Sequence, residues 1–171
     1  KGVVDGEGIS VFPNIYHSVL PFMNDIIKIE GKGNKFGLKK LSGEVILETK
    51  YDRIDSLSEL VFAVTLDGKL GFMNLKGETV IPFDYDAFDE EVAFYNGLAC
   101  VNKLRDDGSY QFGYIDHSNM VVIPFQFSGA QTFKDKDYIE NWITYPAGGD
   151  KSYTRDTYKL ALDGTIILVD S

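Results

Sequence analysis

The sequence contains little of the chemistry on which many enzymes and metal proteins depend. It has one cysteine, Cys100, and two histidines, His17 and His117. A single cysteine forms no internal disulfide and leaves the redox compartment open. No pair of cysteines or histidines has the spacing of a zinc site. Cys100 lies among apolar neighbours, where a thiol is usually buried and inert, so we expect no catalytic residue, no cofactor and no metal.

Basic residues are also scarce. The chain has 17 lysines and arginines against 26 acidic residues, which gives a net charge of −9 and a pI near 4.6. A surface of this charge repels polyanions, so it argues against nucleic acid or an anionic membrane as the main partner. No apolar run reaches the roughly 18 residues of a membrane-spanning helix, and we expect no membrane insertion.

The sequence also has no initiator methionine. It begins at Lys1-Gly2, inside the first strand of a repeated unit. We therefore expect the chain to be a fragment of a longer protein. No window shows a sustained helical period, which favours strands throughout.

What the sequence has instead is internal repetition. The clearest copy is Lys69–Tyr85, in which a short strand, a turn at Asn74–Gly77 and a returning strand follow one another. Turn glycines, with asparagine as the substitute that best tolerates a left-handed conformation, recur at Gly8, Gly43, Gly77, Asn119 and Gly164. Six positions before the first four of these lie Gly2, Gly37, Gly71 and Gly113, which are 37−2=35, 71−37=34 and 113−71=42 residues apart.

A third apolar strand completes each unit. These strands are Ile26–Ile29, Leu60–Val64, Leu98–Val101 and Tyr138–Tyr145. The predicted fold is all-β, with tandem antiparallel three-stranded β-meander repeats stacked as an open superhelix or a small propeller-like array. We expect one repeat domain, 1–171, with units at 1–35, 36–68, 69–110 and 111–157 and a partial unit at 158–171. The connectors Asp52–Glu59 and Asp86–Tyr95 leave room for a turn of helix.

Two details of the repeat predict how the units pack. A glycine inside a strand suggests that another backbone or ring approaches closely. The returning strands carry two adjacent apolar residues, which suggests that both faces are covered by neighbouring units. These pairs are Val11 and Phe12, Ile46 and Leu47, Val80 and Ile81, Val122 and Ile123, and Ile167 and Leu168.

The repeated segments resemble the WG-containing repeat. Phe112–Asp116 is similar to its opening strand, Gly77–Pro82 to its G-K-V-V-I-P segment, and Gly97–Val101 to its G-L-A-x-V segment. The family's tryptophan is replaced by Lys1, Phe36, Leu70 and Phe112, and Tyr158 takes the place of the fifth glycine. The resemblance implies a bacterial, β-rich interaction or binding module without a general catalytic constellation.

The segment that breaks the repeat, Lys134–Tyr158, is the candidate binding region, because insertions in repeat proteins often lie on a binding face. Its candidate contact residues for a partner are Tyr138, Trp142, Tyr145, Tyr153 and Arg155. Tryptophan and tyrosine combine a large contact area with a polar group. In the alternative interpretation, Trp142 and Tyr145 pack in the core and Pro146–Thr157 is a loop.

Three functions remain open from the sequence. The first is a non-enzymatic binding module for a protein or carbohydrate partner, because repetition occurs without a convergent nucleophile, base and electrophile. The second is a hydrolase whose carboxylates gather at the repeat ends, because the separation that such a reaction needs is spatial. The third is a passive structural spacer for another domain.

Overall fold

The computed structural model describes residues 3–4, 10–12, 15–130, 138–146 and 153–170, with side chains described for 15–130, 141 and 155–169. Strands are the dominant regular secondary structure of the described residues, which contain one 3₁₀ turn and no α-helix, so the all-β prediction is confirmed. The chain divides into two compact units, Lys1–Asp84 and Tyr85–Ser171. No helix in the described part of the chain is long and apolar enough to cross a membrane.

The first unit holds a two-stranded ribbon and two four-stranded antiparallel sheets. The ribbon pairs β1 (Val3–Val4) with β2 (Ser10–Phe12). The next sheet contains β3 (Ser18–Met23), β4 (Ile26–Glu30), β5 (Phe36–Lys40) and β6 (Val45–Tyr51) in that order. The third contains β7 (Arg53–Ile54), β8 (Val61–Leu66), β9 (Lys69–Asn74) and β10 (Thr79–Asp86), whose last residues cross the unit boundary.

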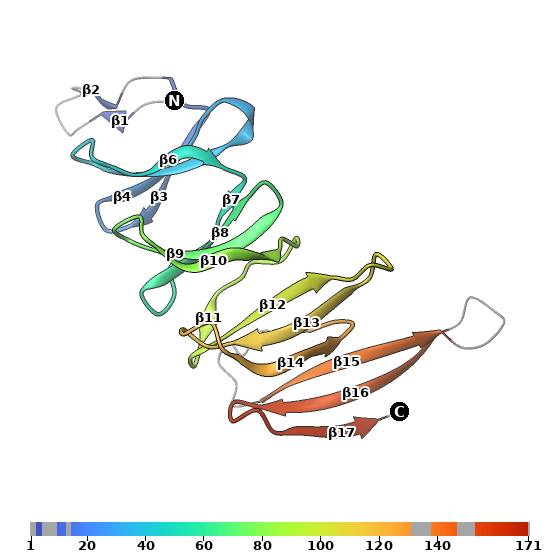
Figure 1. Ribbon diagram of the computed structural model, residues 1–171. Coiled ribbons are helices and arrows are strands. Elements are labelled where there is room, and N and C mark those ends of the chain that lie inside the picture. The colour runs from blue at the N-terminus through green and yellow to red at the C-terminus, as the bar shows by residue number, and fades with distance from the viewer. Residues whose placement is uncertain (1–2, 5–9, 13–14, 131–137, 147–152, 171) are drawn as a thin grey trace. The chain divides into compact units, whose positions relative to one another are not determined.

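The second unit holds one four-stranded and one three-stranded antiparallel sheet. The first contains β11 (Phe94–Tyr95), β12 (Leu98–Leu104), β13 (Tyr110–Ile115) and β14 (Val121–Phe127). The second contains β15 (Tyr138–Pro146), β16 (Tyr153–Ala161) and β17 (Ile166–Asp170). In every sheet the strands follow chain order (Figure 1), as the meander prediction requires.

Three of the sheets have a fourth, edge strand that the repeat pattern does not reveal. The connectors Asp52–Glu59 and Asp86–Tyr95, in which the sequence left room for a turn of helix, instead contain β7, which pairs with β8, and β11, which pairs with β12. Their backbone is extended at these points because this conformation buries Ile54 and Phe94, which are 1% and 0% exposed. Burying these side chains stabilises the short strands more than a local helical turn would. The one helical turn among the described residues, a 3₁₀ turn at Lys32–Asn34, lies elsewhere.

The turns have the predicted chemistry. The side-chain Oδ1 of Asn74 accepts hydrogen bonds from the backbone N–H groups of Lys76 and Glu78, at 3.0 and 3.1 Å. Asp116 plays the same part in the next unit, accepting from Ser118 and Met120. Asn119 has a φ of 63°, so it adopts the left-handed conformation that Gly43, Gly77 and Gly164 adopt at the same place.

Neighbouring sheets within each unit pack face to face (Figure 1). In the first unit, the buried cluster joins Leu38 and Leu47 of one sheet to Phe62 and Met73 of the next. In the second unit, the cluster of β11–β14 is completed by Leu160 of β16. The prediction that a repeat buries the apolar face of its neighbour is therefore confirmed for β3–β6 with β7–β10 and for β11–β14 with β15–β17.

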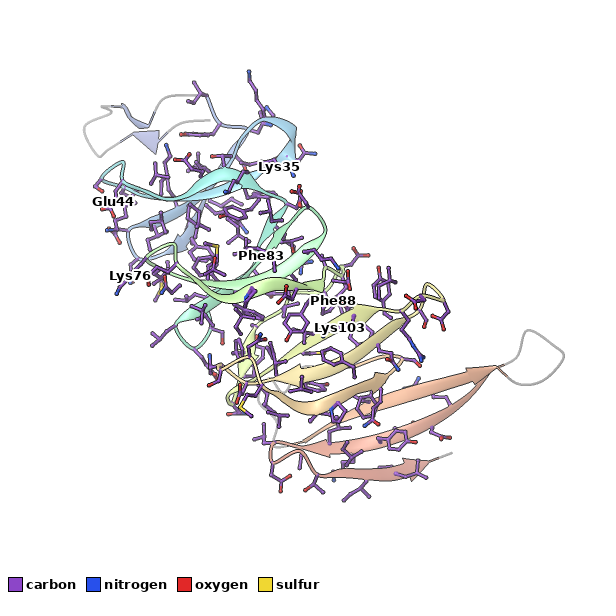
Figure 2. All side chains as sticks on the ribbon, viewed as in Figure 1. Lys35, Glu44, Lys76, Phe83, Phe88 and Lys103 are labelled. Atoms are coloured by element: carbon purple, nitrogen blue, oxygen red, sulfur yellow. The ribbon has the colours of Figure 1, made fainter. Side chains whose placement is uncertain are left out.

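The strand glycines mark a close approach of backbone, as predicted. A Cβ atom on Gly71 or Gly113 would lie 2.8 Å from the carbonyl oxygen of Ile81 or Ile123, and 3.1 Å from a phenylalanine ring carbon. Those rings belong to Phe83, labelled in Figure 2, and Phe125. Only glycine leaves room for the returning strand to coil this tightly over its partner.

The apolar pairs of the returning strands are covered less evenly than predicted. Leu47, Ile81 and Ile123 are buried at 3%, 0% and 0% exposure. Ile46 and Val122 are partly buried, because each is an extra residue in a bulge that leaves the regular alternation. Val80 is 41% exposed near the hairpin end of β10, so the prediction of cover on both faces is wrong there.

Exposure is larger still in β17, where Ile167 and Leu168 are 57% and 53% exposed, so the prediction is wrong for this strand as well.

The first strand of the last repeat starts earlier than the repeat pattern indicates. β16 begins at Tyr153 and pairs with β15 along its whole length, so the loop interpretation of Pro146–Thr157 is wrong for 153–157. Cross-strand hydrogen bonds extend the hairpin beyond the repeated length.

Candidate functional site

The last sheet is built around a long hairpin. β15 and β16 pair from Tyr138 opposite Ala161 to Pro146 opposite Tyr153. The third strand, β17, pairs with β16 only between Thr157 and Leu160. Beyond Trp142 and Thr157 the hairpin is therefore a two-stranded ribbon, which extends past β17 in Figure 1.

One face of this sheet, the inner face, packs against β11–β14. Leu160 is fully buried in the shared cluster, and Tyr158 and Ile166 pack against the same cluster. Asn141 is also fully buried, and its Nδ2 donates a hydrogen bond of 2.7 Å to the Tyr114 hydroxyl. This buried hydrogen bond ties the hairpin to its neighbouring sheet in a fixed register.

The opposite face, here called the outer face, includes the register positions of four of the five candidate contact residues. Side chains alternate along a strand, and directly opposed residues of an antiparallel pair share a face. The register therefore places Tyr138 and Trp142 on the face opposite to Asn141. Arg155, opposite Thr144, and Tyr153, opposite Pro146, share that outer face.

Tyr145 does not join the other four. It alternates in phase with Asn141, so its register position is on the inner face. The side chains of Tyr138, Trp142, Tyr145 and Tyr153 lie outside the described residues, and only their strand positions are given. The Arg155 side chain is described and is exposed.

The outer face differs chemically from the corresponding faces of the other sheets. Directly after the strand glycine, those sheets carry Leu38, Phe72 and Tyr114, all at 0% exposure. In the last sheet Tyr158 replaces the glycine and Lys159 follows it, opposite Glu140. The residue that pairs with Lys159 is Ile167, which is 57% exposed. In two other sheets the residues that pair with the position after the glycine are Leu47 and Ile123, and they are 3% and 0% exposed. The outer face is therefore polar at Lys159 and open to solvent at Ile167.

Sequence reasoning missed the polar residues of this face, Glu140, Thr157 and Lys159. A signal for Lys159 was present, because counting one position beyond Tyr158 reaches a lysine where each earlier repeat has a large apolar residue. Glu140 required the pairing of β15 with β16, which the repeat pattern does not specify.

The one cysteine is buried in the core of the second unit. Cys100 is 6% exposed, and burial raises the pKa of its thiol to about 12, more than the hydrogen bond with Tyr114 lowers it. A thiol with this pKa is almost entirely protonated near neutral pH, and the protonated thiol is a poor nucleophile. His117 is stacked on the ring of Phe94, with centroids 4.0 Å apart.

Three carboxylates in or beside the connectors are engaged in ion pairs or hydrogen bonds. Asp52, where β6 continues into β7, is paired with Lys35 (labelled in Figure 2). The Lys35 hydrogen bond lowers the pKa of the Asp52 carboxyl, and the same bond raises the pKa of the Lys35 ammonium. Asp55 accepts from Arg53 at 3.0 Å, and Asp86 accepts from the backbone N–H of Leu104 at 2.8 Å.

Metal ligands do not gather in the described part of the chain. No group of three or more histidine, cysteine, aspartate or glutamate side chains that could hold a metal ion is found there. Among the described side chains of the last sheet, Arg155, Thr157 and Lys159 share the outer face and can hydrogen-bond a ligand.

Comparison with known families agrees with the repeat register. The family model described as WG containing repeat matches residues 36–69, 71–104 and 112–140, which is 34+34+29=97 of the 171 residues. The three matches begin at or beside Phe36, Gly71 and Phe112, in the first strands β5, β9 and β13. Among curated proteins, none matches the chain. The third match ends within β15, so Trp142, Tyr153 and Arg155 lie beyond the matched residues.

Proposed function

The chain belongs to the WG containing repeat family, and from this premise we propose that it is a non-enzymatic binding module. Its sheets form a scaffold, and the outer face of β15–β17 contacts a protein or carbohydrate partner. Rigid strands place contact residues more accurately than loops do, which suits a repeat protein to recognition.

The chemistry of the outer face carries this proposal. In the earlier repeats the same face is made of buried apolar residues such as Leu38 and Tyr114. In the last sheet it offers Lys159 opposite Glu140, together with the register positions of Tyr138, Trp142, Tyr153 and Arg155. Aromatic and arginine residues are enriched where proteins bind partners, and polar groups orient the ligand.

The arrangement of reactive groups supports binding rather than catalysis. Cys100 is buried, with its thiol pKa raised to about 12 by burial. The carboxyl groups of Asp52 and Asp55 are engaged with Lys35 and Arg53. A catalytic site needs a nucleophile, a base and a stabilising group around one reacting atom, and these residues serve packing and the junction between sheets instead.

The charge of the chain supports a partner that is not strongly acidic. A net charge of −9 disfavours nucleic acid and anionic membrane surfaces at physiological salt. The proposal therefore retains proteins and carbohydrates as the classes of partner.

The proposal is tested by probing arrays of immobilised peptides and of immobilised oligosaccharides with the 171-residue chain and with a Trp142→Ala/Tyr153→Ala variant. We expect the double variant to lose at least about tenfold in affinity, because two central aromatic contacts are removed. Tyr110→Ala is the matched control, since Tyr110 is 44% exposed on a different hairpin, and it should bind as the unchanged chain does.

Two results would overturn the proposal. Binding that survives in the double variant would show that the ligand contacts another surface. An absence of binding on both arrays, with circular dichroism showing folded protein, would favour the passive spacer.

A further inference from the structure

We propose that the first unit has an interaction surface of its own, the hairpin-end surface, which binds a basic amphipathic helix of a partner protein. This surface comprises five exposed apolar residues, namely Met23, Leu41, Val45, Leu60 and Val80. It belongs to the first unit, whereas the outer face of β15–β17 belongs to the second. The two proposals therefore stand or fall separately.

Leu60 occupies a turn whose backbone conformation suits glycine. Ser58 and Val61 exchange backbone hydrogen bonds of 2.9 and 3.1 Å, so Glu59-Leu60 forms a two-residue turn. The φ angles of these two residues are 50° and 70°, and turns of this left-handed kind strongly favour Asn-Gly. The corresponding turn before β12 is Asn96-Gly97, with φ angles of 54° and 80°.

The leucine in this turn is unfavourable for the folded chain in two respects. A residue with a Cβ strains a left-handed backbone. Leu60 is also 81% exposed, so it buries little apolar surface in return. A position that breaks a local rule without a gain in packing is expected at a functional site, and this makes Leu60 the central contact of the surface.

The turns of β3–β6 and β7–β10 meet at one end of the first unit. Within β3–β6, the backbone N–H of Leu41 donates a hydrogen bond of 2.7 Å to the carbonyl oxygen of Asp25, which joins two turns of that sheet. A Cβ on Gly77 would lie 2.5 Å from the carbonyl oxygen of Ile46. The turn after β9 therefore lies against the start of β6 in the neighbouring sheet.

Leu60 lies at the same end. The residue after it, Val61, pairs with Asn74, where the turn after β9 begins. Figure 2 shows Glu44 and Lys76, one from a turn of each sheet, at this end of the unit. Exposed apolar residues from both sheets thus gather at one place among charged side chains, which is typical of a protein interaction site.

The separation of the two sheets favours a helical partner. Packed sheets lie about 10 Å apart, so Leu41 and Val45 are separated from Leu60 and Val80 by about that distance. On an α-helix, residues seven positions apart share a face and lie about 10.5 Å apart. On an extended strand, residues of one face lie about 6.6 or about 13 Å apart, and neither spacing matches.

The charges of the turns favour a basic partner. Residues 24–25, 41–44, 59–60 and 75–78 of these turns include four acidic residues and one basic residue, namely Asp25, Glu44, Glu59, Glu78 and Lys76. Glu44 is paired with Lys40 at 2.8 Å, and the surface keeps an excess of negative charge. Lysine or arginine residues beside the apolar face of the partner helix complement this charge.

The test is fluorescence anisotropy with a labelled peptide of about 18 residues, long enough to form a helix, made of leucines on one face and lysines on the other. We expect it to bind the 171-residue chain. Leu60→Gly should weaken binding at least about tenfold, because the central contact is removed. Leu104→Ala, which removes an exposed leucine of the second unit, is the control and should leave the affinity unchanged.

Thermal unfolding of Leu60→Gly separates a lost contact from a lost fold. Glycine relieves the left-handed strain, so the melting temperature should not fall. A fall in the melting temperature would mean that Leu60 stabilises the first unit by packing, which contradicts its assignment as a contact residue.

Other results would also overturn the proposal. Binding that survives Leu60→Gly, or no binding of the peptide to the folded chain, would contradict the hairpin-end surface as its site. Equal affinity for a peptide with glutamate in place of lysine would contradict a basic partner, and tighter binding of an extended peptide of alternating leucine and lysine would contradict a helical one. Self-association of the chain that is abolished by Leu60→Gly would identify a second copy as the occupant instead.

Discussion

The two sheets of the second unit share one repeat register but differ at a few positions. In β11–β14, Gly113 is followed by Tyr114, which lies opposite Cys100, and all three are buried. In β15–β17, Tyr158 is followed by Lys159, which lies opposite Glu140. The comparison teaches that the glycine and the residue after it control two separate properties, the curvature of the returning strand and the chemistry of the outer face.

Curvature follows from the missing side chain of the glycine. Tyr114 pairs with Ile123 and Ile115 with Val121, so Val122 is an extra, bulged residue in β14. In the last sheet Lys159 pairs with Ile167 and Leu160 with Ile166, and no residue is bulged between them. Ile123 can coil over Gly113 because no Cβ is present, whereas the side chain of Tyr158 occupies that space.

The largest expected contrast is in thiol reactivity at equivalent positions. Cys100 in β12 corresponds to Glu140 in β15, since each lies opposite the residue that follows the glycine position. A Glu140→Cys thiol, in a Cys100→Ala background, should react with a disulfide reagent about a thousandfold faster than Cys100 near pH 8, because burial raises the pKa of Cys100 to about 12.

The measurement is the rate of thiol modification followed by absorbance. Unfolding in urea should make Cys100 as reactive as the introduced cysteine, which controls for the reagent. Slow modification of the cysteine at position 140 would show that the outer face is covered, and rapid modification of native Cys100 would show that the inner cluster is open.

The next contrast is in stability. Ile123 and Ile167 occupy the same pairing position, but they are 0% and 57% exposed. Ile123→Ala should cost about 2–5 kcal/mol of unfolding free energy, because it leaves a cavity in the core. Ile167→Ala should cost less than about 1 kcal/mol, because it removes mostly solvated surface.

Urea unfolding of the two variants checks this contrast, with the fluorescence of Trp142 and circular dichroism as independent probes. Equal losses at the two positions would contradict the conclusion that the outer face of the last sheet is exposed where that of its neighbour is buried.

A smaller difference is expected at the glycine position itself. Gly113→Val should cost about 2–3 kcal/mol, because its Cβ would meet the Ile123 carbonyl oxygen at 2.8 Å and force the strands apart. Tyr158→Val should cost about 1 kcal/mol, mainly through the lost edge contact with the Phe127 ring at 5.7 Å. Thermal unfolding of both variants measures the difference, and an unchanged melting temperature for Gly113→Val would refute the close approach.

Much of the fold could be predicted from the sequence because its signals are local. A turn such as Asn74–Gly77 is determined by side-chain hydrogen bonds and a positive φ within four residues. The short edge strands β7 and β11 were missed because two residues show no periodicity. Their formation depends on burial of Ile54 and Phe94 by distant parts of the chain.

The candidate site was predictable in part. Residue type alone pointed to Tyr138, Trp142, Tyr153 and Arg155, but their common face depends on the register between β15 and β16. A shift of one residue would move every side chain of one strand to the other face. That register is tied to the buried hydrogen bond between Asn141 and Tyr114, which joins residues 27 positions apart and leaves no local signal.

The smallest expected changes in unfolding free energy come from substitutions at the turn glycines. Comparing two of these glycines distinguishes the effect of backbone conformation from the effect of packing. Gly77 and Gly164 both have positive φ, at 79° and 86°. A Cβ on Gly77 would lie 2.5 Å from the Ile46 carbonyl oxygen of the preceding sheet, whereas one on Gly164 would lie 3.4 Å from that of Val122. Asparagine tolerates the left-handed conformation, as Asn119 does at a φ of 63°.

Gly164→Asn should therefore change the unfolding free energy by no more than about 0.5 kcal/mol, while Gly77→Asn should cost about 1–2 kcal/mol because the bulge at Ile46 must move away. Chemical denaturation of the two variants, with Gly108→Asn at an open hairpin tip as the control, measures both values. Similar losses at Gly77 and Gly164 would mean that the turns contribute through conformation alone. The unequal losses expected here would show that the following turn holds the bulge at Ile46 more tightly than the bulge at Val122.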